Sequence, residues 1–344
     1  MLATQENSKM NLSAPRRLIW IDVLKGLGML AVVGAHIYSG IIPRVFYLFH
    51  MPLFFFVGGY LLRRHDDLKS FAISKAVHLL IPYVCFLLIV YPMQVYLEFS
   101  GGDRSIDSRT VLRVLATPII GGRLLVGPAA VFWFVTCFYI SQQLTNLLVV
   151  KCSRRAINLW LVLLIVLAYC NSVLFPRFWL PWNINVACAA VPIFYVGHLL
   201  GAGNWKEDRR QMWWSSMLSV VSVALVYLGY LPSLDMKNAA YGVPVLTFTF
   251  SFAWIFALVG IAKVLAKETL VASILREIGV SSMVIMYLHQ AIQLSIPMIF
   301  GIGNTTFRFG VAICGSYVIY RVIARFSITR HLLLGERTKS IRAT

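Results

Sequence analysis

Charged residues are scarce in this 344-residue chain, and acidic ones are the scarcest, with 13 Asp and Glu against 31 Lys and Arg. Charged residues make up 13% of the sequence, whereas soluble domains carry roughly 25%. Hydrophobic residues make up 59%. This composition excludes an ordinary soluble protein and leaves no room for a large soluble domain. A net charge of +18 is also typical of nucleic-acid-binding proteins. In a membrane chain it indicates basic cytoplasmic loops, so we expect no nucleic acid partner.

The sequence lacks the motifs of several catalytic classes. No two of its six cysteines have CxxC spacing, so neither a zinc site nor a disulfide framework is indicated. It contains no Walker A pattern and no HExxH, so we expect no bound metal and no P-loop nucleotide site. It has no internal repeat, a feature that secondary transporters often carry. The first apolar segment contains Asp22 and Lys25 and no small-residue cleavage pattern follows it, so we expect a retained membrane span.

Apolar segments of membrane-spanning length recur along the chain, and they predict an all-α, polytopic membrane protein with about ten transmembrane helices. We expect a short interfacial helix at 63–76 and loops around 98–130 and 266–279. The predicted spans are 18–39, 45–62, 77–97, 131–150, 156–174, 184–201, 213–230, 241–265, 280–299 and 307–326.

Lys and Arg are distributed unevenly between the two sides that these spans define. If the N-terminus is cytoplasmic, 22 of them fall in inside segments, 8 in outside segments and Lys25 within the first span. Cytoplasmic loops carry such an excess, so both termini are expected in the cytoplasm. We divide the chain into a cytoplasmic tail at 1–17, a transmembrane domain at 18–326 and a basic cytoplasmic tail at 327–344.

Three ionisable residues, Asp22, Lys25 and His36, lie in the first predicted span. Lys25 and His36 are eleven residues apart, which is three helical turns plus roughly 20°, so they face one side about 16 Å apart along the axis. Asp22 precedes Lys25 by three residues and can pair with it. Ionisable groups are costly at bilayer depth, so this row predicts a face that lines a cavity.

Four segments in order resemble the acyltransferase-3 family of membrane O-acyltransferases. The first is Lys25, ten residues and His36, and the second is FHMPLFFFVGGY at 49–60. The third is the pair Trp133 and Phe134, and the fourth is GVSSMVIMYLH at 279–289. Within that family, these segments resemble those of fucose and polysaccharide O-acetyltransferases, which include rhizobial nodulation-factor acetylases.

The resemblance implies a multi-pass enzyme of the bacterial inner membrane. Such an enzyme moves an acetyl group from acetyl-CoA to a sugar hydroxyl of a surface or secreted glycan, or of a lipid-linked oligosaccharide. Acetyl-CoA, the glycan acceptor and membrane lipid are the expected partners, and no permanently bound cofactor is expected. A hydroxyl needs a base within reach as it attacks a carbonyl, and His36 suits this role because the ordinary pKa of histidine is near 6.5.

We expect the catalytic row to be His36, Lys25 and Asp22, with Lys25 attracting the phosphates of CoA. The expected binding residues are His50, Arg63, Arg64, Lys75, His78, Trp133 and His289. The family usually has Arg-x-x-Arg where this chain has Lys75 and His78. Lysine cannot form a planar bidentate fork, so we expect a looser phosphate contact there.

Each candidate also has a structural interpretation. His36, His50 and His289 could be core histidines, and Asp22 with Lys25 a purely structural pair. The positions Arg63, Arg64, Lys75 and His78 could be ordinary inside charge. Trp133 could be an aromatic residue of the membrane interface rather than part of a substrate wall.

Two other functions compete with the acyltransferase. One is a proton-coupled transporter of a small solute or glycan precursor, which would use Asp22, Lys25 and His36 as its path. The other is a non-catalytic membrane partner, which has no need of three ionisable groups on one buried face.

Overall fold

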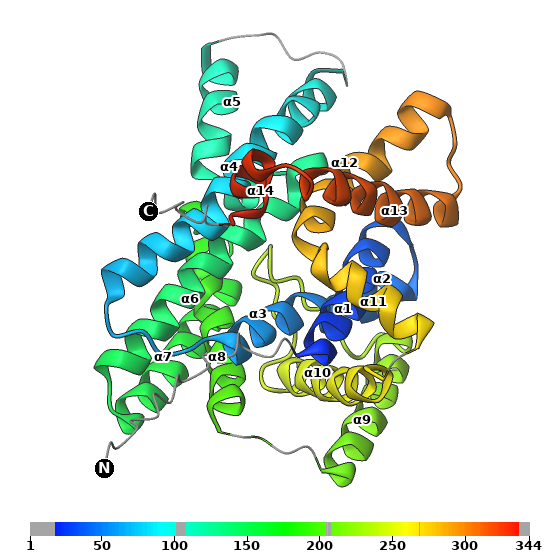
Figure 1. Cartoon of the computed structure of the whole chain (residues 1–344). Helices are drawn as coiled ribbons and strands as arrows, with labels where there is room; N and C mark the ends of the chain where they lie inside the picture. Colours follow the sequence, from blue (N-terminus) through cyan, green and yellow to red (C-terminus); the bar gives the residue numbers. More distant parts are fainter. Residues whose placement is uncertain (1–17, 101–107, 204, 206–207, 268, 337–344) are drawn as a thin grey trace, which may run out of the picture.

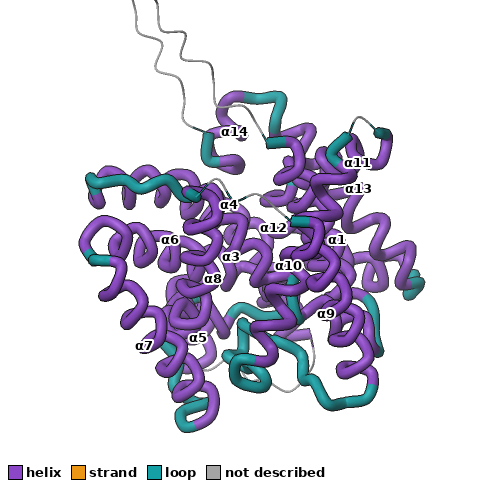
Figure 2. Tube along the Cα trace, turned by 90° about the horizontal axis from the view of Figure 1, so that it is seen from below, coloured by secondary structure: helices purple, strands orange, loops and turns teal. Residues whose placement is uncertain are grey.

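The computed structural model describes residues 18–100, 108–203, 205, 208–267 and 269–336, and within these ranges it is helical without a strand (Figure 1 and Figure 2). Nine helical segments of the described residues are long and apolar enough to cross a membrane. The prediction of an all-α polytopic membrane protein is therefore confirmed. The predicted tail at 1–17 lies outside the described residues.

The elements follow one another with short connections. The α-helices are α1 Ile19–Ile37, α2 Ile41–Tyr47, α3 His50–Leu61, α4 Leu68–Ser100, α5 Ser108–Ile120, α6 Trp133–Lys151, α7 Arg154–Val173, α8 Ile184–Ala202, α9 Arg209–Tyr227, α10 Leu246–Leu265, α11 Leu270–Val280, α12 Ser282–Phe300, α13 Thr305–Ile323 and α14 Ser327–Leu334. Three 3-10 turns, η1 Gly122–Leu124, η2 Gly127–Phe132 and η3 Pro181–Asn183, precede α6 and α8.

Helix α1 lies at the centre of the bundle (Figure 1). Of its spanning residues 67% are buried inside the protein, whereas only 11% of those in α7 are, so α7 faces lipid. Helix α1 packs against α3, α10, α11, α12 and α13. Its Asp22, Lys25 and His36 are therefore surrounded by protein, as ionisable groups in a membrane require.

The seventh predicted span, 213–230, coincides with α9, a helix as long as α8 that is less apolar than the nine segments counted above. Its Ser215, Ser219 and Ser222 are buried, and Ser222 Oγ accepts a hydrogen bond from Trp254 Nε1 of α10 at 2.9 Å. Serine hydroxyls lower the hydropathy of α9, yet they face the neighbouring helix rather than lipid. Small polar residues are common at such helix–helix contacts in membranes.

Several predicted connections differ from the structure. The interfacial helix expected at 63–76 is absent as a separate element, because α4 begins at Leu68 and continues without a break to Ser100. The loop expected at 98–130 contains α5, η1 and the start of η2. The loop expected at 266–279 contains α11, which packs along α1. Window averages of hydropathy miss such short helices, because only one of their faces is apolar.

Candidate active site

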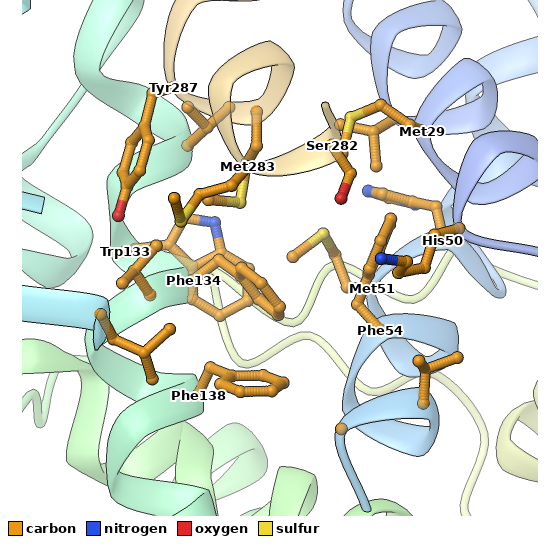
Figure 3. Close-up of a pocket in the computed structure, with 18 of the residues that line it drawn as sticks. Met29, His50, Met51, Phe54, Trp133, Phe134, Phe138, Ser282, Met283 and Tyr287 are labelled. Atoms are coloured by element: carbon orange, nitrogen blue, oxygen red, sulfur yellow. The ribbon is translucent and has the colours of Figure 1, made fainter. Parts of the chain in front are cut away.

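A cavity of about 770 Å³ lies between the helices around α1. Its walls come from α1, α3, α4, α6 and α12, from the loop before α10 and from the residues that end α14. Figure 3 shows its central part, with α3 residues on one side and α6 residues on the other. Segments far apart in the sequence therefore share one space.

One face of α1 lines this cavity along its length. Lys25, Met29, Val32 and His36 succeed one another at intervals of four, three and four residues, and all four line the space. The spacing of the sequence predicts this shared face. Lys25 thus stands at one end of the cavity and His36 about 16 Å further along the helix.

Three histidines and a tyrosine cluster at the His36 end. The His36 ring centroid lies 5.5 Å from that of His289 on α12 and 6.3 Å from that of Tyr47 on α2. Tyr47 in turn lies 4.8 Å from His50, the first residue of α3. His36, Tyr47 and His50 line the cavity, while His289 is fully buried behind His36. Within the described ranges, these side chains do not form a metal-binding group of three.

Backbone carbonyls determine which ring nitrogen carries the hydrogen in two of these histidines. His50 Nδ1 lies 2.7 Å from Phe46 O, and His289 Nδ1 lies 2.8 Å from Ile285 O. A carbonyl can only accept, so each Nδ1 carries the hydrogen and donates it. In the neutral ring this leaves the lone pair on Nε2. Nε2 of His289 has no hydrogen-bond partner among the described residues and is buried. Nε2 of His289 is therefore an acceptor without a donor in this buried cluster.

Basic groups stand at the opposite end. Lys25 Nζ lies 2.9 Å from Asp22 Oδ1, an ion pair that the three-residue spacing predicts. Lys75 and His78 of α4 also line the cavity. Part of the predicted C-terminal tail closes this end, where Glu336 lines the cavity and His78 Nδ1 lies 3.2 Å from Gly335 O.

The middle of the cavity is lined by apolar side chains, both aromatic rings and flexible methionines. Trp133, Phe134 and Phe138 of α6 form one wall, and Met51 of α3 and Met283 of α12 extend toward it from the other sides (Figure 3). Trp133 is thus part of the cavity wall and is 5% exposed. Thioether side chains adapt to different shapes, so this section suits a flexible chain.

Two predicted binding residues stay away from the cavity. Arg63 and Arg64 are exposed after the end of α3. Arg63 Nη1 donates to Gly201 O at 3.3 Å, and Arg64 pairs with Asp66 at 2.8 Å. Neither of them lines the cavity, so the structural interpretation as ordinary inside charge fits them better.

Sequence reasoning missed the segment Asp235–Asn238, which lines the cavity near the histidine cluster. Lys237 Nζ donates to Leu125 O at 2.6 Å. Burial lowers the pKa of Lys237 to about 8, opposed by attraction to Asp235 and assisted by repulsion from Arg123. The segment has no helical periodicity, so its return into the bundle leaves no signal in the sequence.

Comparison with known proteins gives one match. A family model described as an acyltransferase domain matches residues 18–324, which is most of the chain and includes every element from α1 to α13. No curated protein and no solved structure matches it.

Proposed function

The chain belongs to the acyltransferase-3 family of membrane proteins, and from that membership we propose that it moves an acetyl group from acetyl-CoA to a sugar hydroxyl. The acceptor is a surface or secreted glycan, or a lipid-linked oligosaccharide. The proposed location is the bacterial inner membrane, with the donor entering from the cytoplasm. Transfer of an acyl group is the coarser activity that the family itself carries.

The cavity is the observation that supports this proposal most directly. It joins a basic end at Lys25, Lys75 and His78 to an imidazole end at His36 and His50. An anionic, elongated donor fits a channel that is basic at one end and apolar along its middle. The separation of about 16 Å along α1 suits a donor whose phosphates stay near Lys25 while its thioester reaches His36.

In the proposed reaction, His36 accepts the proton of the acceptor hydroxyl as the oxygen attacks the thioester carbonyl. A carbon–oxygen bond forms and the carbon–sulfur bond breaks, which gives the acetyl ester and the CoA thiolate. The proton on the imidazole then passes to that thiolate, so the base is restored. His289 and Tyr47, whose rings flank His36, hold its ring in place.

Replacement of His36 tests this function. In membranes supplied with labelled acetyl-CoA and bacterial surface glycan, His36→Ala is expected to abolish ester formation, a loss of at least about 100-fold for a general base. His65→Ala is the matched control, because His65 is exposed and does not line the cavity. Ester formation at the wild-type rate by a His36→Ala protein that inserts normally would contradict the mechanism.

A further inference from the structure

The outer hairpin, defined here as residues 231–241, holds a lysine at the imidazole end of the cavity. An antiparallel bridge joins Asp235 and Ala240, and Met236 and Ala239 beside them are buried. Asn183 Nδ2 also donates to Lys237 O at 3.3 Å. These contacts give Lys237 a defined position in the wall of the cavity.

The Lys237 ammonium is incompletely paired. An ammonium has three donors, and Nζ uses one of them toward Leu125 O. It forms no ion pair with any carboxylate in the described part of the chain. Burying a charge without an anionic partner costs free energy. The same burial disfavours the charged form of Lys237 and lowers its pKa.

A second cation, Arg123, belongs to another connection and lies near Lys237. Arg123 lies two residues before Leu125, stacks over the ring of Trp179 at 4.7 Å, and is close enough to repel Lys237. Asp235 is the neighbouring carboxylate, but it accepts two hydrogen bonds from Asn238, through the backbone N at 3.2 Å and Nδ2 at 2.8 Å. Lys237 thus lines the outer end of the cavity, with Arg123 as a nearby exposed cation outside the lining, and the carboxylate of Asp235 already accepts hydrogen bonds within its own turn.

We propose that the outer end of the cavity is an acceptor subsite for an anionic saccharide, whose carboxylate or phosphate is bound by Lys237 and attracted by the nearby charge of Arg123. This inference rests on the proposed function, because the bound sugar must present a hydroxyl to His36. A charge-assisted hydrogen bond to the anion supplies the partner that the Lys237 ammonium lacks, whereas a neutral sugar leaves that charge uncompensated. The subsite therefore selects the acceptor by charge, and the histidine cluster performs the transfer.

Chemical labelling of Lys237 tests the subsite without any turnover. An amine with a pKa near 8 is acetylated readily by a water-soluble ester reagent at pH 7.5, and mass spectrometry of the peptide measures the rate. The probes are methyl glucuronide, methyl glucoside 6-phosphate and methyl glucoside. We expect at least one anionic probe to slow labelling by about tenfold, as a charge-assisted hydrogen bond would, and the neutral glucoside to have little effect. The probe that protects identifies the carboxylate or the phosphate as the ligand.

Variants and pH sharpen the test. Arg123→Gln should weaken protection, whereas Arg44→Gln should not, because the charge of Arg123 acts on Lys237 and that of Arg44, another exposed arginine, does not. The charges near Lys237 are Asp235, Arg123 and the ionisable His36. Because the amine is charged below about pH 8 and neutral above it, the ratio of rates with and without the anionic probe should approach one as pH rises through 8.

Equal protection by the three probes, or protection by none of them, would overturn the subsite. So would protection that Arg123→Gln leaves unchanged. The assay needs neither donor nor catalysis, so a protein that fails to transfer acetyl groups can still show anion-selective protection. The failure of the proposed function and the failure of the subsite are therefore separate results.

Discussion

At the scale of single residues, Asp22 and Lys25 have different roles although they form one pair. The Asp22 side chain is 6% exposed, and it does not line the cavity, whereas the Lys25 side chain is 24% exposed and does. Asp22 therefore compensates the charge of Lys25 in an apolar interior, and Lys25 keeps one side open to a ligand. Truncating one member of a buried ion pair is strongly destabilising, because the other charge loses its counter-ion.

This asymmetry predicts different results for single and double variants. Lys25→Ala should destabilise the protein by about 3–5 kcal/mol, because it removes the cation that is paired with the buried Asp22 carboxylate. Adding Asp22→Asn to Lys25→Ala should recover much of that stability. The KM for acetyl-CoA should be raised in both the single and the double variant, because both lack the Lys25 ammonium. Thermal unfolding in detergent and donor kinetics measure the two effects.

The exposed pair of Arg64 and Asp66 is the matched control for this experiment. Its N–O distance is 2.8 Å, close to that of the buried pair, but both side chains are more than half exposed. Arg64→Ala should therefore change stability by less than about 1 kcal/mol. A double variant as unstable as Lys25→Ala would mean that the charge of the Asp22 carboxylate is not the cause of the lost stability.

At the scale of elements, glycines set the distance between α3 and α8. A Cβ added at Gly59 would lie 1.8 Å from Phe194 O, and one added at Gly197 would lie 2.1 Å from Phe56 O. No side chain fits at either position, so the two backbones are in direct contact. Helices in lipid associate through such close packing of small residues. Because α3 carries His50, Met51 and Phe54, this contact also positions one wall of the cavity.

We therefore predict that Gly197→Ala separates α3 from α8. The expected loss of stability is about 1–3 kcal/mol, as in other overpacked interiors, together with reduced transfer activity. Gly310→Ala is the matched control, since Gly310 lies within α13 and a Cβ there has nothing within 4 Å. That substitution should be neutral or stabilising by up to about 1 kcal/mol, because alanine favours a helix. Equal loss of stability in both variants, measured by thermal unfolding, would disprove the packing argument.

The elements also show how far the sequence determines this site. The shared face of Lys25 and His36 is predictable because both lie on one helix and helical geometry relates them. The approach of His289 to His36 is not, because it depends on how α12 packs against α1. The position of the hairpin that contains Lys237 is even harder to predict, because it depends on the burial of Met236 and Ala239 and on no periodic pattern.

At the scale of the whole molecule, the contacts of Lys263 bring the ends of three helices to one face of the membrane domain. Lys263 Nζ near the end of α10 lies 5.2 Å from the ring centroid of Trp20 in α1 and 4.7 Å from that of Trp205 before α9. The start of α1, the start of α9 and the end of α10 are therefore at the same level. The outer hairpin follows α9 and precedes α10 at the other end of the cavity. Helix α9 thus traverses the bundle in the direction opposite to α10, despite its lower hydropathy.

This arrangement predicts ten crossings rather than nine, and cysteine labelling can count them. The six native cysteines are free, so a background with all of them replaced by serine is feasible. With α9 crossing, Asp208→Cys before α9 and Ser327→Cys after α13 should face the cytoplasm and react with a membrane-impermeant maleimide only after permeabilisation. Tyr230→Cys should react in intact cells, because Tyr230 is exposed at the end that contains the outer hairpin. If α9 lay along the surface instead, Asp208→Cys and Tyr230→Cys would react on the same side. The segment after α13, with Arg325 and Arg330, would then face outside, against the excess of cytoplasmic Lys and Arg that membrane proteins show.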